Sequence, residues 1–110
     1  MAKKIPKKVK ELLREAGVEL RNIYSNRLKE IVLYGSYARG DYSSGSDVDI
    51  LLILEESSEL AAERERYFPI VSRISLKYDT VLSVIPFDYQ TYMTKKSPLI
   101  LNAHREGVLI

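Results

Sequence analysis

The chain has 110 residues, of which 17 are Lys or Arg and 15 are Asp or Glu, so its formal net charge is +2. This length is too short for two domains, and 45% hydrophobic with 29% charged residues fits one globular domain, residues 1–110, and excludes a disordered or fibrous chain. With no Cys and a single His, disulfide scaffolds and metal sites built from thiolates or imidazoles are excluded as well.

The amino-terminal third predicts a helix and then a strand. Pro6 suits the first turn of the helix, and Gly17 is a place where it would bend or break. Residues 29–34 predict a short buried strand that Gly35 closes. Apolar residues recur every three or four positions, as on a helix face that packs on a core: Val9, Leu12, Leu13, Ala16, Leu20, Ile23 and Tyr24.

The middle third predicts a surface loop, a central strand and a second helix. Residues 47–54 (DVDILLIL) are apolar on both faces beyond their start, which is typical of a central strand. Ser57 or Ser58 is available to cap the helix that follows, and Pro69 predicts a kink or two shorter helices. The apolar stripe of this helix is Leu60, Tyr67, Val71, Ile74 and Tyr78.

The last third predicts a strand over residues 80–87, ended by Pro86, and two short helices. Asp88 caps the first helix, and Ser97 and Pro98 open the second, which Gly107 ends. The terminal VLI predicts a fourth strand at the sheet edge. We therefore expect an α/β (α+β) fold, with a small mixed sheet flanked by helices.

Neither a membrane segment nor strong nucleic-acid binding is indicated. The longest apolar run, residues 50–54, is far shorter than the roughly 20 residues that span a bilayer, and the basic start leads into an amphipathic stretch rather than a signal-peptide core. A soluble, cytoplasmic protein is expected. Five of the first ten residues are Lys, which form either a solvated helix start or a local anion-attracting patch.

Two carboxylates stand at the start of the central strand. On an extended strand, residues two apart share a face, so Asp47 and Asp49 project side by side. Adjacent carboxylates repel each other, which is tolerable where divalent cations bind between them, and oxygen-only ligands favour Mg²⁺ or Mn²⁺. The alternative is a plain solvated strand start.

A second feature, Gly35-Ser36 after the preceding strand, resembles a phosphate-binding turn. Gly allows a close backbone approach, a following helix start offers N–H groups, and the Ser36 hydroxyl adds a donor. Arg39 lies one turn further on, where it could either reach a phosphate or fix the loop, and Gly40 permits the left-handed turn that ends the helix. The alternative is an ordinary turn.

Together, the run GSYARGDYSSGSDVDILLI closely resembles the signature of the DNA polymerase beta nucleotidyltransferase superfamily. Within it, the chain is similar to minimal nucleotidyltransferases, the antitoxin partners of HEPN-domain toxins. The resemblance implies a polymerase-beta-like fold in which Gly35 and Ser36 bind phosphate. It further implies that Asp47 and Asp49 bind metal, and it requires a third catalytic, metal-binding carboxylate from a neighbouring strand.

Asp79 is the best candidate for this third carboxylate, although it also fits a turn residue that ends the preceding helix. The weaker candidates are Asp41, Glu55, Glu56 and Asp88. The resemblance implies two Mg²⁺ ions, with Mn²⁺ as an alternative, and ATP as substrate. Arg39 and a lysine such as Lys77 are candidates for holding the triphosphate, and of these only Arg39 falls within the motif. The implied acceptor is a tyrosine of a cognate HEPN toxin, held in a hetero-oligomer.

Two other functions remain open at this stage. The chain could neutralise its partner by docking, with weak catalysis or none, and a third carboxylate that does not converge on the site would favour this function. Alternatively, the lysine-rich start binds nucleic acid, in a regulator or an RNA-end nucleotidyltransferase. Tyr37 and Tyr42, which border the motif loop, are candidates for stacking on a base or contacting a partner.

Overall fold

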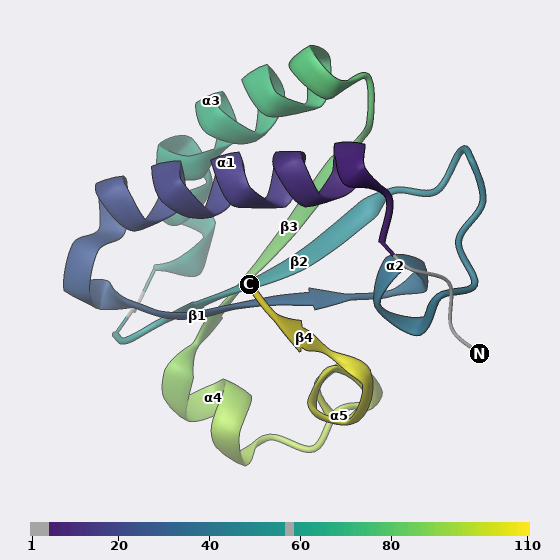
Figure 1. Ribbon diagram of the computed structural model, residues 1–110. Helices are drawn as coiled ribbons and strands as arrows, with labels where there is room; N and C mark the ends of the chain where they lie inside the picture. Colours follow the sequence, from purple (N-terminus) through teal and green to yellow (C-terminus); the bar gives the residue numbers. More distant parts are fainter. Residues whose placement is uncertain (1–4, 57–58) are drawn as a thin grey trace.

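The computed structural model describes residues 5–56 and 59–110, and it shows a four-stranded sheet with helices on both faces (Figure 1). The α/β prediction with a mixed sheet is confirmed. The helices are α1 (Lys7–Tyr24), the 3₁₀ turn η1 (Ser25–Arg27), α2 (Ser36–Arg39), α3 (Leu60–Tyr78), α4 (Tyr89–Thr94) and α5 (Pro98–Glu106). The strands are β1 (Leu28–Tyr34), β2 (Val48–Leu54), β3 (Leu82–Asp88) and β4 (Val108–Leu109).

The sheet has the strand order β3-β2-β1-β4. Strand β1 runs antiparallel to both β2 and β4, whereas β2 and β3 are parallel. Every residue of β2 except Asp49 is buried, as expected of a central strand, and β4 lies at an edge. The register aligns Tyr34 on β1, Asp49 on β2 and Ser83 on β3 in one row across the sheet.

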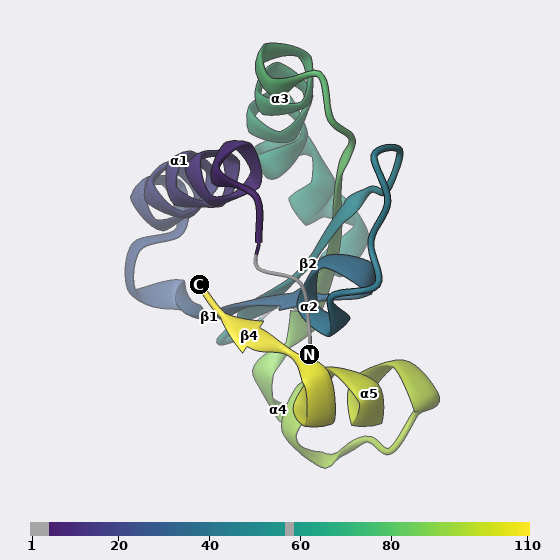
Figure 2. The ribbon, with the colours of Figure 1, turned by 45° about the vertical axis from the view of Figure 1, so that its right-hand side comes forward.

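Each face of the sheet carries its own apolar cluster. Helices α1 and α3 lie side by side over one face, and α4 and α5 cover part of the other (Figures 1 and 2). Side chains alternate along β2, so Ile50 and Leu52 join the α1/α3 cluster, whereas Leu51 and Ile53 join the α4/α5 cluster. Asp49 has the same parity as Leu51 and therefore projects on the α4/α5 face.

Ion pairs hold α1 to α3 beside the apolar contact. Glu15 on α1 accepts hydrogen bonds from Lys77 at 2.7 Å, from the Tyr78 hydroxyl at 2.9 Å and from Arg73 at 3.2 Å. Glu63, 7% exposed at the start of α3, pairs with Arg27 next to the end of α1. These contacts hold α1 and α3 together as the helix layer on one face of the sheet.

Several expected breaks are absent. Helix α1 continues through Gly17, and α3 is one helix that contains Pro69. Strand β3 continues past Pro86 to Asp88, which an edge strand allows because the missing N–H of Pro need not face a neighbour. Ile23, assigned to the core stripe of α1, is instead 40% exposed.

The capping predictions for α4 and α5 are confirmed. Asp88 accepts a hydrogen bond from the Thr91 N–H, and Ser97 accepts one from the Ile100 N–H. The proposed caps Ser57 and Ser58 lie outside the described residues, as do two of the five amino-terminal lysines, Lys3 and Lys4. Among the residues described, no helix has the length and apolar character needed to cross a bilayer.

Candidate active site

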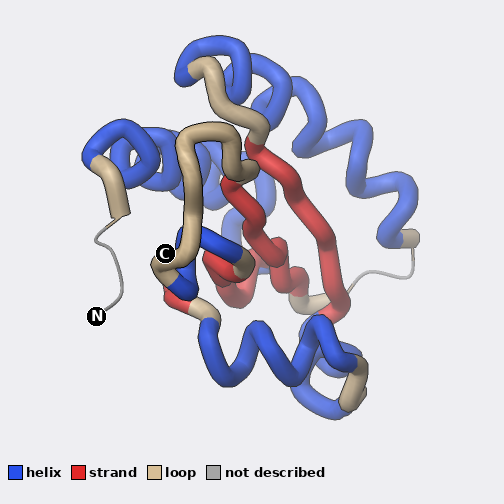
Figure 3. The backbone as a smooth tube through the Cα atoms, turned by 90° about the vertical axis from the view of Figure 1, so that its right-hand side faces the viewer, coloured by secondary structure: helices blue, strands red, loops and turns tan. Residues whose placement is uncertain are grey.

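The candidate residues gather where β1 ends and where β2 and β3 begin. Because β1 is antiparallel to β2, its carboxyl end meets the amino ends of β2 and β3 at one end of the sheet. Figure 3 shows this end of β2 and β3 beside the loop that leads into β2, away from α4. Helix α2 follows β1 directly at this end, so the Gly35-Ser36 turn stands next to the first residues of β2.

Gly35 and Asp49 approach each other closely. Gly35 has φ of +79°, a conformation that residues with a side chain rarely adopt, and a Cβ at this position would lie 2.6 Å from Oδ2 of Asp49. The tight turn after β1 therefore requires Gly, and it brings the expected phosphate-binding turn against one of the expected metal-binding carboxylates.

The electrostatics of Asp49 suit a cation. Burial raises the pKa of Asp49 above its ordinary value, the negative charge of Asp47 raises it further, and the positive charge of Arg39 opposes both. Asp47 itself is exposed at the end of the loop. A cation between the two carboxylates would relieve their repulsion.

Helix α2 presents Ser36 and Arg39. The carbonyl of Gly35 accepts hydrogen bonds from the N–H groups of Ala38 and Arg39, so these two amides are engaged within the turn. Gly40 has φ of +90° and ends the helix in the left-handed conformation that the sequence predicts. Arg39 pairs with Asp41 at 3.2 Å and with Glu106 of α5 at 3.8 Å. Exposed pairs of this kind contribute about 0–1 kcal/mol, which leaves the guanidinium able to exchange its partners for a phosphate.

Asp79 occupies a turn. It ends α3 with φ of +50° and ψ of 45°, and its N–H donates to the Leu76 carbonyl. Among residues 5–56 and 59–110, no three Asp, Glu, His or Cys side chains come together as a metal-binding group. The structure thus brings Asp47 and Asp49 together at the start of β2, and the residues it describes supply no third carboxylate that completes a metal-binding group with them.

The neighbours of the aspartates on β3 were not singled out from the sequence. Ser83 is the register partner of Asp49, and the Val48 N–H donates to the Val81 carbonyl at 2.8 Å, which places Val81 beside Asp47. In a parallel pair, partners project on the same face, so Ser83 flanks Asp49, and Val81, which directly precedes β3, lies next to Asp47. Only strand register reveals this, and a single sequence does not specify which strands pair.

The other candidates have different partners. Lys77 pairs with Glu15 between α1 and α3, Asp88 caps α4, and Glu55 pairs with Lys29. Asp41 pairs with Arg39, and the backbone carbonyl of Glu56 accepts a hydrogen bond from Arg27.

The two tyrosines of the motif loop stack on each other. Tyr37 is buried in the α1/α3 cluster, and its ring centroid lies 4.6 Å from that of Tyr42. The buried Tyr37 ring thus serves as packing, which leaves Tyr42 as the partly exposed member of the pair.

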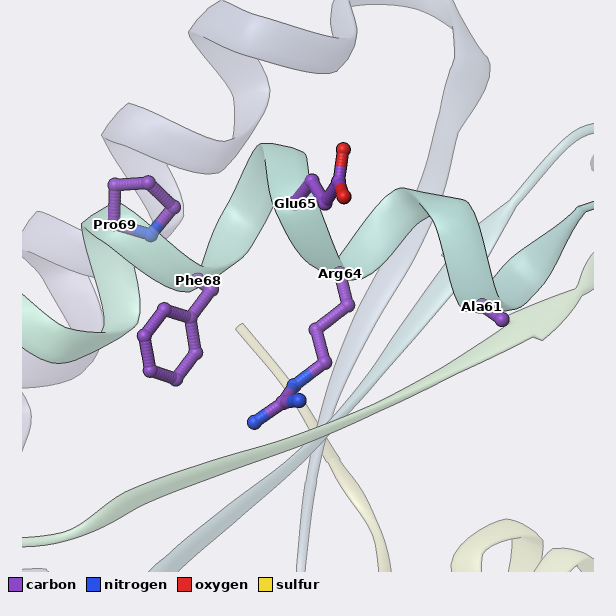
Figure 4. Close-up of a pocket in the computed structure, with 5 residues that line it drawn as sticks. All are labelled: Ala61, Arg64, Glu65, Phe68 and Pro69. Carbon is purple, nitrogen blue, oxygen red and sulfur yellow. The ribbon is translucent and has the colours of Figure 1, made fainter.

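A hollow of about 440 Å³ lies along α3 and is separate from this site. In Figure 4, Arg64 and Phe68 project together from the helix, and the guanidinium carbon of Arg64 lies 4.9 Å from the centroid of the Phe68 ring. Ala61, Glu65 and Pro69 complete the lining. Helix α3 covers the opposite face of the sheet from Asp47 and Asp49, so this hollow adds nothing to their chemistry.

The side chains at the start of β2 and in the turn after β1 are of the chemical type that binds a divalent metal together with a nucleotide. Asp47, Asp49 and the Ser36 hydroxyl offer only oxygen donors, which Mg²⁺ and Mn²⁺ prefer. The contact between Gly35 and Asp49 leaves no room for a side chain, so the Asp49 carboxylate stands against the backbone that would bind phosphate. Two carboxylates leave coordination positions for phosphate oxygens and water.

Both the sequence and the fold resemble those of known proteins. The profile of the family described as "Nucleotidyltransferase domain" matches residues 3–107. A protein of Methanocaldococcus jannaschii named "Putative protein adenylyltransferase MJ0141" is 41% identical over 75 residues, which cover 68% of this chain and 75% of that protein.

Two solved structures share the fold. A toxin–antitoxin crystal structure with AMP-PNP aligns with a TM-score of 0.57 and 19% identity, covering 86% of this chain and 68% of that chain. A crystal structure from Sulfolobus solfataricus, described as a putative nucleotidyltransferase, aligns with a TM-score of 0.56 and 22% identity, covering 94% and 86%.

Proposed function

The chain belongs to the nucleotidyltransferase domain family, and from this we propose that it transfers AMP from ATP to a tyrosine hydroxyl of a HEPN-domain toxin, using Mg²⁺ or Mn²⁺. The tyrosine oxygen bonds to the α-phosphorus, and pyrophosphate and the hydroxyl proton are released. The observation that carries the proposal is the contact between Gly35 and Asp49, because it joins a phosphate-binding turn to a metal-binding carboxylate. The relative named as a protein adenylyltransferase and the toxin–antitoxin structure with AMP-PNP support the choice of nucleotide and partner.

Each residue has a defined role in the proposed reaction. Asp47 and Asp49 hold the metal ions, which when bound lower the pKa of a hydroxyl and neutralise phosphate charge. Gly35 brings the backbone close to the triphosphate, and the Ser36 hydroxyl donates to a phosphate oxygen. Arg39 leaves Asp41 and Glu106 to pair with the triphosphate. Catalysis then rests on positioning and charge stabilisation.

Labelled ATP tests the proposal. The purified chain, Mg²⁺ and a cognate HEPN-domain protein should yield labelled HEPN protein, and EDTA should abolish the labelling. Asp47→Asn or Asp49→Asn should lower the rate about 100-fold or more, because metal-ion stabilisation is worth several kcal/mol. Transfer that survives both substitutions would contradict the proposal.

The third carboxylate is tested by one further conservative variant. Asp79→Asn should retain transfer, because Asp79 occupies the turn that ends α3. Loss of transfer in this variant, with an unchanged melting temperature, would instead give Asp79 the catalytic role that the sequence resemblance implies.

A second function is favoured by the two-carboxylate site. Without a third carboxylate beside Asp47 and Asp49 in the described residues, an antitoxin that acts by docking alone is also consistent. This function predicts that the double variant Asp47→Asn/Asp49→Asn binds the HEPN protein with unchanged affinity and still suppresses its toxicity. The catalytic proposal predicts that suppression is lost.

A further inference from the structure

One side of the aspartate pair is open. The proposed triphosphate site lies on the β1 side of Asp49, where α2 and Arg39 stand. On the other side lies β3, which is an edge strand of the sheet. The edge strand β3 therefore offers an acceptor an approach to the aspartates that does not cross the proposed triphosphate site.

The residues nearest the aspartates on this side are Val81, which directly precedes β3, and Ser83 on β3. Val81 is 57% exposed although it is apolar and β-branched, whereas the next residue, Leu82, is 3% exposed on the opposite face. Farther along the strand, Ile85 and Phe87 pack against the cluster that α4 and α5 cover. On this side, the exposed side chain is thus Val81, just before the strand, and the partly buried Ser83 follows beside Asp49.

We infer that Val81 and Ser83, which we call the acceptor surface, form the docking site for the acceptor protein of the proposed transfer. Both side chains are uncharged, so they suit the apolar surroundings of a protein hydroxyl better than a second anionic nucleotide. An apolar contact on Val81 would hold the partner next to Asp47, and its hydroxyl-bearing side chain would extend across Ser83 towards Asp49. This inference rests on the proposed function, since it concerns the acceptor of that reaction.

The test uses an uncharged substitution, because a new carboxylate beside Asp47 would alter the metal site. Val81→Gln should raise the KM for the cognate HEPN-domain protein about tenfold, as expected for loss of a central apolar contact. The KM for ATP should stay unchanged. Leu109→Gln is the matched control, because Leu109 is 68% exposed on β4 at the other edge of the sheet and should leave both constants unchanged.

The affinity for the HEPN protein, measured by calorimetry without ATP, separates this inference from the proposed function. If the wild-type chain transfers no nucleotide, the proposed function fails, and a roughly tenfold weaker affinity of Val81→Gln alone still supports the docking surface. Wild-type affinity and KM for Val81→Gln would overturn the inference while the function stands. A wild-type dimer that Val81→Gln dissociates would also overturn it, because the surface would then serve a second copy.

Discussion

Gly35 combines two requirements that only glycine meets. Its φ of +79° costs another residue about 1–2 kcal/mol, and an added Cβ would displace the Asp49 carboxylate. Gly35→Ala should therefore lower the free energy of unfolding by at least that amount and also lower the transfer rate. Urea unfolding and the labelled-ATP assay measure the two effects.

Gly45 is the matched control for this substitution. A Cβ there would meet nothing within 4 Å, so Gly45→Ala should change the free energy of unfolding by no more than about 1 kcal/mol and leave transfer intact. Wild-type transfer by Gly35→Ala would show that the close approach to Asp49 is not needed for the reaction.

At the residue scale, the sequence predicts the features that neighbouring residues determine, and it does not predict the features that strand pairing determines. The positive φ at Gly35 and at Gly40 fits local chain chemistry, and the structure shows both, whereas the approach of Gly35 to Asp49 depends on the pairing of β1 with β2. Asp79 is different, because its position beside a strand start fits a ligand and a turn equally well until the end of α3 is known. Ser83 carries no local signal, since only pairing with β2 places it beside Asp49.

At the scale of elements, the pairing of α1 with α3 depends on Glu15. Hydrogen bonds from Lys77, Tyr78 and Arg73 lower the pKa of Glu15 from 4.5 to about 2. Because the folded state favours the ionised carboxylate, its contribution to stability is fully present above pH 4.5 and is lost as the pH falls towards 2. Glu15→Gln should therefore lower the melting temperature at pH 7 and flatten its decline between pH 4.5 and 2.

Glu11 supplies the control for this prediction, because it is exposed one turn earlier on α1. Glu11→Gln should keep the wild-type decline of melting temperature with falling pH. An equal flattening in both variants would contradict the role assigned to Glu15.

The elements themselves follow largely from periodicity and caps, and the discrepancies occur at prolines. Pro69 lies inside α3 and Pro86 inside β3, where local preference favours an end. At both prolines, packing against the rest of the domain outweighs the local preference of Pro to end the element. Tyr67 and Ile74, on either side of Pro69, are buried in the same cluster, and β3 pairs with β2 through the whole register from Leu82 to Asp88.

For the whole molecule, the alternation of helices and strands indicates the fold class, but not the strand order. The pairing of β1 with both β2 and β4, and of β2 with β3, depends on which apolar faces meet in space. Yet this order determines the chemistry. It puts α2 on one side of the aspartates and an exposed edge strand on the other.

The two aspartates lie in segments that differ in burial, and we expect these segments to differ in mobility as well. Its residues from Ile50 to Leu54 are each 0% exposed and lie between two partner strands, so their amides should exchange with solvent only when the whole domain unfolds. The loop before it is largely exposed at Asp41, Ser43, Ser44 and Gly45, and its amides should exchange orders of magnitude faster. Hydrogen exchange followed by mass spectrometry would locate this boundary, and slow exchange across the loop would contradict it.

Asp49 thus belongs to the part of the molecule that opens last, and Asp47 to the margin of a part that opens readily. In the proposed reaction, the strand would hold Asp49 in place, and Asp47 would act from the margin of the exposed loop.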